Sequence, residues 1–105
     1  MYLPVVGIHY RVTEDDQESI TAALPLRVNL VREPTNNSDE NAIKVVLAEH
    51  IDHFHIGYVP RDIAAKLAPR LDENQIWLEA STLTELEGNS GRVFVSFRKK
   101  IRSDP

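Results

Sequence analysis

The segment from Leu30 to Leu67 reads LVREPTNNSDENAIKVVLAEHIDHFHIGYVPRDIAAKL, and it decides the fold. Over 28–32 and 43–47 the residues alternate in the period-two pattern of half-buried strands. The polar stretch 33–41 between them is longer than a tight hairpin requires. Its side chains are of the kinds that bind hydroxyls, amides and phosphates, and loops held by strands often carry function. The alternative is a long turn whose Asn and Asp side chains bond their own backbone.

The rest of the chain is mostly strand in pattern. Strands are expected over 2–12 (with Gly7 as a bulge), 25–33, 41–48, 54–59, 75–84 and 92–97. The last two form a hairpin, in which Ile76, Leu78 and Ala80 share one face. The residues expected to be buried are Ala42, Ile43, Val45, Ile56, Ile63 and Leu67. Six strands and short turns predict a mainly β fold, a small, partly open barrel of the SH3-like or OB-like kind.

One or two short helices complete this prediction. Pro60 favours the first turn of a helix, and helical spacing continues to Pro69, which is expected to end it. Thr13 has Asp16 three residues on and can cap a second helix through Ala23. A solvated acidic loop is the equal alternative there.

Composition indicates a single domain over 1–105, with a flexible basic tail over 98–105. There is no cysteine, so a disulfide framework is excluded and a cytoplasmic location is expected. No apolar run is long enough to cross a bilayer, and no membrane partner is expected. The net charge of -4 argues against non-specific binding to nucleic acid, so any such contact must be local.

One group of residues fits single-stranded nucleic acid. Tyr10 supplies an aromatic ring, Asp39 and Asn41 supply hydrogen-bonding groups, and Tyr58 and Arg61 lie where a strand meets a helix. Single strands need a surface for base stacking and a charge for phosphate, and stacking contributes about 1–3 kcal/mol per base. Alternatively, the two tyrosines are barrel-wall aromatics with satisfied hydroxyls.

Two motifs carry a family resemblance. The stretch R-E-P-x-N-x-x-D-x-N-A-I-x-V over 32–45 is followed by I-G-Y-V-P-R-D-I-A-x-x-L-A over 56–68. Together they resemble the HIRAN domain, the amino-terminal module of helicase-like transcription factor proteins, which also occurs alone or fused in bacteria and phages. The resemblance extends from about Val5 to Leu71. It implies a barrel that grips the 3′ end of single-stranded DNA.

The resemblance also implies roles for individual residues. Tyr10 falls on the aromatic that stacks on a terminal base, and His9 on a neighbouring basic position. Asp39 matches the acid that accepts a hydrogen bond from the 3′ hydroxyl. Tyr58 and Arg61 fall near the positions that hold phosphate. Arg32 and Asn41 complete the expected nucleic-acid contacts.

Two positions depart from the family pattern. Ser38 stands where the DNA-end-binding members have a tyrosine, and its hydroxymethyl group cannot stack. Pro60 replaces a lysine of some relatives. Both differences weaken the implied 3′-end specificity more than the implied fold.

Three histidines are weaker candidates for a metal site: His50, His53 and His55, with Glu49 and Asp52 nearby. Structural zinc usually has four ligands including thiolates, so an exposed turn with incidental histidines is the better interpretation. No cofactor is expected. A metal-dependent nuclease built from Glu49, Asp39 and His55 is a remote alternative.

The sequence therefore predicts a non-enzymatic module that binds single-stranded DNA or DNA ends in repair or replication-fork processing. A helicase or nuclease is expected as its partner or fused domain. The alternative is an adaptor barrel that adds a peptide strand to a free sheet edge.

Overall fold

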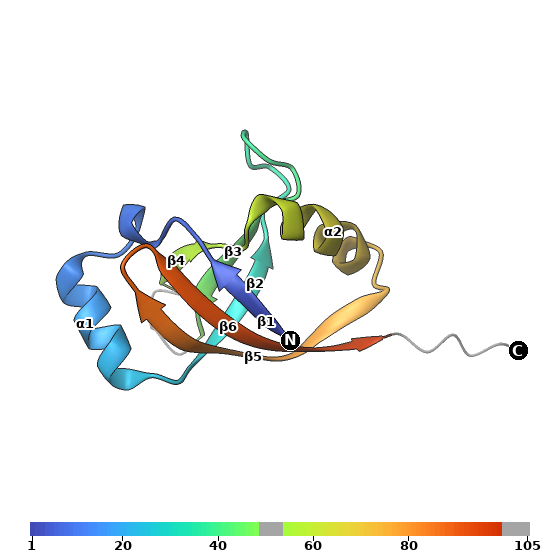
Figure 1. Cartoon of the computed structure of the whole chain (residues 1–105). Helices are drawn as coiled ribbons and strands as arrows, with labels where there is room; N and C mark the ends of the chain where they lie inside the picture. Colours follow the sequence, from blue (N-terminus) through green and yellow to red (C-terminus); the bar gives the residue numbers. More distant parts are fainter. Residues whose placement is uncertain (49–53, 100–105) are drawn as a thin grey trace, which may run out of the picture.

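The computed structural model describes residues 1–48 and 54–99, which fold around a single curled sheet (Figure 1). The elements in chain order are β1 (Tyr2–Val5), the 3-10 helix η1 (Ile8–Tyr10), α1 (Glu14–Ala23), β2 (Leu26–Arg32), β3 (Ile43–Leu47), β4 (His55–Tyr58), α2 (Arg61–Asp72), β5 (Ile76–Glu87) and β6 (Ser90–Lys99). This confirms the prediction of a mainly β fold with short helices.

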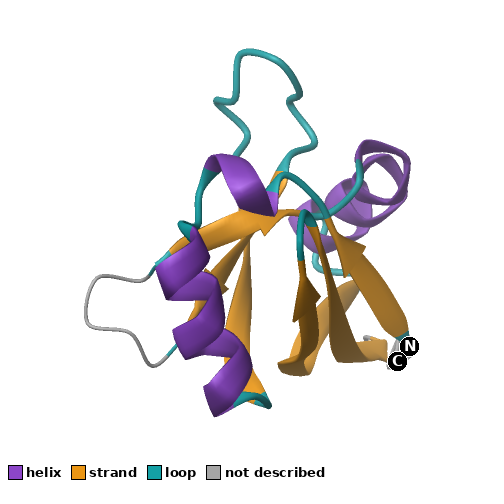
Figure 2. Ribbon diagram, turned by 60° about the vertical axis from the view of Figure 1, so that its left-hand side comes forward, coloured by secondary structure: helices purple, strands orange, loops and turns teal. Residues whose placement is uncertain are grey.

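The six strands pair antiparallel in the order β1-β6-β5-β2-β3-β4 and curl into a partly open barrel (Figure 2). Within residues 1–48 and 54–99, the two ends of this strand order, β1 and β4, meet at one end only. There Val6 and Tyr58 exchange two backbone hydrogen bonds, N to O distances of 2.9 and 3.0 Å. Gly57 makes this approach possible, because a Cβ atom on it would lie 2.6 Å from the Val6 carbonyl oxygen. Closure at this end brings the loop 33–42, β4 and the start of α2 together.

Alternating residues of the strands fill the barrel. Ile43 and Val45 on β3, Ile56 on β4, and Ala42 just before β3 are all buried, as is Leu67 on α2. These five expected core positions are thus confirmed. Burying such side chains is the main source of stability, at roughly 25 cal/mol per Å² of apolar surface.

Ile63, expected to be buried, is only half-buried and packs against the edge of the core. The prediction for the β5 face was also wrong at one position. The register slips between Leu78 and Ala80, which leaves Ala80 exposed and turns Ser81 inward. The buried Ser81 hydroxyl donates a hydrogen bond to the Val28 carbonyl oxygen. A bulge of this kind adds one residue to the strand, so the residues after it face the opposite side from the one that strict alternation predicts.

The first predicted strand is shorter than expected. Gly7 adopts a left-handed φ of 75°, which ends extended structure and starts η1 rather than forming a bulge within a strand. Ile8 then turns inward and is fully buried. Tyr10, expected on a strand, therefore lies on η1.

Thr13 caps α1 as predicted, since its hydroxyl accepts from the Asp16 amide at 3.2 Å. Pro69 does not end the second helix, which continues to Asp72. Pro69 is one turn from the C-terminus, and Glu73 N still donates to its carbonyl oxygen at 3.0 Å. A residue outside the helix also stabilises its last turn, because the Arg32 guanidinium donates two hydrogen bonds to the Asp72 carboxylate.

Arg98 and Lys99, expected in a flexible tail, pair with β5 as the last residues of β6. The rest of that tail, 100–105, lies outside the described residues. Across 1–48 and 54–99, no helix has the length and apolar character needed to span a membrane.

Candidate nucleic-acid interface

A shallow pocket of about 340 Å³ opens at the closed end of the barrel. Its lining comes from four places: Val6 after β1, the loop 33–42, the end of β4 and the first residue of α2. The residues are Val6, Asn36, Ser38, Asp39, Ala42, Tyr58, Val59 and Arg61. Three of the sequence-predicted site residues, Asp39, Tyr58 and Arg61, therefore meet here.

The loop that walls this pocket is held by its own side chains. Asn36 Oδ1 accepts from the amides of Ser38 and Asp39 at 2.9 and 3.0 Å. Asp39 Oδ1 accepts from the Asn41 amide at 2.9 Å. Asn36 and Asp39 therefore stabilise the turn by bonding its backbone, as the alternative interpretation of this loop expected. This bonding occupies one carboxylate oxygen of Asp39, and the other lies 3.9 Å from Arg61 Nε.

Arg61 joins α2 to the same loop. Its guanidinium also donates to the Ser38 carbonyl oxygen, and the side chain is otherwise largely exposed. The first helical hydrogen bond runs from Ala64 N to Pro60 O, so the α2 amides before Ala64 have no partner within the helix. The start of a helix carries a partial positive charge, which favours an anion beside Arg61.

Tyr58 has an internal hydrogen-bond partner. Its hydroxyl donates to Glu33 Oε1 at 3.0 Å. Burial, followed by this bond to Glu33, raises the pKa of the Tyr58 phenol. The Asn36 amide, with the Tyr58 hydroxyl and Lys44, lowers the pKa of the Glu33 carboxyl. Glu33 is thus an ionised acceptor that fixes the orientation of the tyrosine ring.

One cation lies near the Tyr58 ring, and another lies beside its hydrogen-bond partner Glu33. The Arg11 guanidinium lies 5.7 Å from the Tyr58 ring centre, and the Lys44 ammonium lies 4.0 Å from Glu33. Burial, and then the Arg11 charge, lowers the pKa of His55, whose ring contacts Tyr58 edge-on at 4.7 Å. His55 is therefore neutral at pH 7. Arg11, Lys44 and Arg61 thus bring three cations to this end, where they lie close to the Tyr58 ring and to the Glu33 and Asp39 carboxylates.

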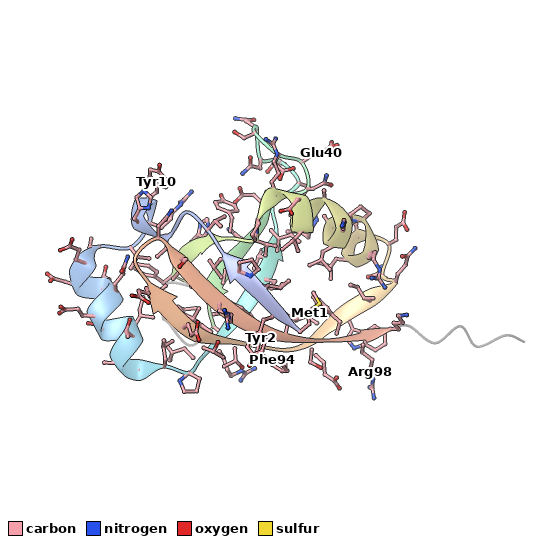
Figure 3. The ribbon with its side chains drawn as sticks, viewed as in Figure 1. Met1, Tyr2, Tyr10, Glu40, Phe94 and Arg98 are labelled. Atoms are coloured by element: carbon pink, nitrogen blue, oxygen red, sulfur yellow. The ribbon has the colours of Figure 1, made fainter. Side chains whose placement is uncertain are left out.

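Tyr10 and His9 lie on η1, beside β4 at the same end of the barrel (Figure 3). The Tyr10 side chain is 81% exposed and projects away from the body of the protein, as does Glu40 from the loop. The His9 ring lies against Tyr10 at 4.0 Å between centres. Tyr10 is thus an open ring on the short helix that contacts β4, and it is no part of the barrel wall.

Arg32 faces the other side of the loop. It forms a two-bond ion pair with Asp72 at 2.8 and 2.9 Å and donates to the carbonyl oxygens of Glu40 and Ala42. This bonding raises the pKa of Arg32 and lowers that of the Asp72 carboxyl. The structure thus gives Arg32 a positioning role, and its contact with DNA stays a prediction.

Sequence reasoning did not select Val6, Arg11, Glu33 or Lys44. Val6 and Arg11 fall within the first predicted strand, Lys44 falls within a later one, and Glu33 belongs to the family motif without a role of its own. Their roles depend on the closure between Val6 and Tyr58, which joins residues far apart in the chain. His50 and His53 lie outside the described residues. Within 1–48 and 54–99, no three His, Cys, Asp or Glu side chains gather as a metal site.

The loop's hydrogen bonds make a prediction about acid. A lowered carboxyl pKa stabilises the fold above the ordinary value, 4.5 for Glu33, and that contribution is lost as the pH falls through the lowered value. Glu33→Gln keeps an acceptor for Asn36 and Tyr58 but cannot titrate. We expect the melting temperature of Glu33→Gln to fall less than that of the unmodified chain between about pH 5 and pH 3. Equal falls in the two proteins would contradict this account.

Comparison with known proteins agrees with the fold and the motifs. The crystal structure of the HIRAN domain of human HLTF superposes with a TM-score of 0.71, at 22% identity over 92% of this chain and 73% of that one. The NMR structure of the HLTF HIRAN domain in its DNA-bound conformation gives 0.65 and 22% over 92% of this chain and 72% of that one.

Two curated relatives are plant proteins called Fanconi-associated nuclease 1 homolog. The rice protein is 42% identical over 50% of this chain, and the Arabidopsis thaliana protein is 34% identical over 71%. The matches span only 5% and 8% of those two proteins. The family model of the HIRAN domain matches residues 1–99. The chain therefore belongs to the HIRAN domain family.

Proposed function

We propose that this HIRAN domain binds single-stranded DNA and receives its 3′ end in the pocket between the loop 33–42 and α2. One observation supports this most: Asp39, Tyr58 and Arg61 line one pocket, and η1, which contacts β4, carries the exposed ring of Tyr10. The pocket combines a hydrogen-bond acceptor, an aromatic, a cation and a helix start. Those are the groups that a nucleotide with a free end requires.

Tyr10 supplies the stacking surface. A side chain that is 81% exposed leaves much of its ring surface in solvent even with His9 beside it, so a base can cover that surface without rearranging the core. Stacking contributes about 1–3 kcal/mol per base, enough to offset an unfavourable net charge. We expect His9, which packs against Tyr10, to support the ring's position.

Arg61 and the start of α2 receive the phosphate. The present partners of Arg61 are the Ser38 carbonyl oxygen and Asp39, both on the loop. Because the Arg61 side chain is 75% exposed, its ion pair with Asp39 contributes little and exchanges readily for a phosphate. The phosphate then gains both the guanidinium and the helix amides.

Asp39 receives the terminal hydroxyl. Its Oδ1 is occupied by the Asn41 amide, and its Oδ2 faces the pocket. A carboxylate accepts a hydroxyl hydrogen bond but repels a phosphate at the same place. Ser38 contributes no ring above this position, so we expect the selectivity for the 3′ end to be several-fold rather than absolute.

The comparisons support DNA as the ligand, since the HLTF HIRAN domain has a DNA-bound conformation. We propose that this chain is a binding module without enzymatic activity. The plant relatives named as nucleases share only a small part of their length with it, and we propose that the shared part locates DNA ends for a nuclease or helicase. That role belongs to DNA repair or replication-fork processing.

The alternative, addition of a peptide strand to a free edge, is disfavoured at β1. Met1 and Val95 of β6 exchange two backbone hydrogen bonds. Because the backbone groups of alternate residues in an antiparallel strand point to opposite sides, those of Tyr2 and Pro4 point away from β6, to the free edge. Proline has no N–H to donate, and a proline on an edge strand blocks regular pairing with another strand. We therefore favour DNA over a peptide.

Fluorescence anisotropy tests the proposal. The unmodified chain should bind a single-stranded oligonucleotide with a free 3′ hydroxyl more tightly than a blunt duplex, at low and at physiological salt. Tyr10→Ala should weaken this binding about fivefold or more without lowering the melting temperature. Absence of binding to any oligonucleotide at high micromolar protein would refute the proposal.

The same titration tests the end contact. A 3′-phosphorylated oligonucleotide should bind several-fold more weakly than its 3′-hydroxyl twin, and Asp39→Asn should shrink that difference. Glu40→Gln, which removes a neighbouring exposed carboxylate outside the pocket, should leave the difference unchanged. Equal affinities for the two 3′ chemistries would remove end recognition and leave general single-strand binding.

A further inference from the structure

The outer face of β1 and β6 carries two exposed aromatic side chains. Tyr2 and Phe94 are directly paired across the strands, and their rings meet edge-to-face with centres 5.2 Å apart (Figure 3). Tyr2 is 57% exposed and Phe94 is 41% exposed. On the inner face of the same strands, Leu3 and Val93 are buried. The two rings therefore contribute little to the core.

A cation accompanies this pair. The Arg92 guanidinium lies 5.6 Å from the Tyr2 ring centre and 3.7 Å from a Glu85 carboxylate oxygen. Both side chains of that ion pair are more than half exposed, so the pair is weak and exchanges with solvent ions. An arginine beside two aromatic rings matches a phosphate next to stacked bases.

The strand β1 connects this pair to the pocket. Tyr2, Pro4 and Val6 are exposed, whereas Leu3 and Val5 between them are buried, so the three share the outer face. Val6 is itself part of the pocket lining. At about 3.3 Å per residue, Tyr2 lies roughly 13 Å from Val6, a length that about four stacked nucleotides cover.

We propose that the strip formed by Tyr2, Pro4, Val6, Arg92 and Phe94, the β1 strip, binds the single-stranded DNA that lies 5′ of the end held in the pocket. This inference rests on the proposed function. Single-stranded DNA is the occupant because a strand whose 3′ end lies in the pocket must continue out of it, and the β1 strip provides two exposed rings and a cation along that course. A protein that bound the β1 strip would not need to extend from the pocket.

Varying the length of the oligonucleotide separates the contribution of the β1 strip to affinity from that of the pocket. Oligothymidylates with a 3′ hydroxyl, from about two to about eight nucleotides long, are titrated into the full chain. Affinity should rise between the shortest and the longest by at least about fivefold, the lower end of the effect of one stacked base. The double variant Tyr2→Ala/Phe94→Ala should lose this rise and bind the shortest oligonucleotide as the unmodified chain does.

Binding of the shortest oligonucleotide also shows that the double variant is folded. Tyr2→Phe, which keeps the ring, should keep the rise, and so should Val31→Ala, which shortens a similarly exposed apolar side chain three strands away. An unchanged rise in the double variant, or an affinity that stops increasing beyond the shortest oligonucleotide, would overturn the inference and leave the rings to a protein partner. Failure to bind at every length would refute the proposed function as well.

Discussion

Ile43→Ala is expected to lower the free energy of unfolding by about 2–5 kcal/mol, a large part of the ~5–15 kcal/mol typical of a domain. Ile43 is fully buried on β3, the strand between β2 and β4. Its backbone carbonyl oxygen also accepts from the Val59 amide at 3.0 Å, just before α2. Deleting this side chain leaves a cavity at the point where the sheet meets the segment that carries Arg61.

Urea denaturation monitored by circular dichroism measures this loss. Val31→Ala is the matched control, because Val31 is on the neighbouring strand β2 with 38% of its surface exposed. The control should cost well under half as much, since most of the deleted surface is already in water. Similar losses for the two variants would show that the sheet does not have its core on the Ile43 face.

Gly57→Ala is expected to crowd its surroundings more than alanine at any other glycine of the chain. The new Cβ atom would lie 2.6 Å from the Val6 carbonyl oxygen and 2.8 Å from a Val5 methyl group. The carbonyl oxygen cannot move away without disturbing the hydrogen bond that it accepts from the Tyr58 amide. We expect a loss of about 1–3 kcal/mol in stability from overpacking, together with a displaced Val6 and weaker DNA binding.

Gly91→Ala is the control for this substitution. Its Cβ atom would meet the Glu85 carbonyl oxygen and the end of the Ile8 side chain at 3.1 Å each, so a few tenths of an ångström of adjustment is enough. The same urea titration compares the two variants. If Gly57→Ala is no more destabilised than Gly91→Ala, the closure between Val6 and Tyr58 does not depend on the absence of a side chain at Gly57.

The sequence predicted the regular elements well where a local signal exists. The strands on both sides of the loop 33–42 have period-two patterns, and Thr13 has the side chain that an N-cap needs. These signals lie within a few residues of the structure they produce. The HIRAN motifs also lie within 32–68, so they indicate the family without reference to the fold.

The errors occur where the deciding interaction is distant in the chain. Pro69 stays helical because the turn after it is held by Arg32, forty residues earlier. Gly7 turns left-handed and directs Ile8 into the core, although an apolar run on both sides favours a continuous strand. The bulge at Ala80 has no local signal at all. In the site, likewise, Val6 reaches Tyr58 only through closure of the barrel.

Backbone NMR of the labelled chain during titration with a short 3′-hydroxyl oligonucleotide tests the central claim most directly. The account predicts that the largest shift changes fall on the pocket and the ring beside it, at Val6, Tyr10, Asp39, Tyr58 and Arg61, with smaller changes along β1. Val31 and the exposed face of α1 should be unaffected. Changes centred on α1 or on the β2 face, with the pocket amides unmoved, would contradict the account.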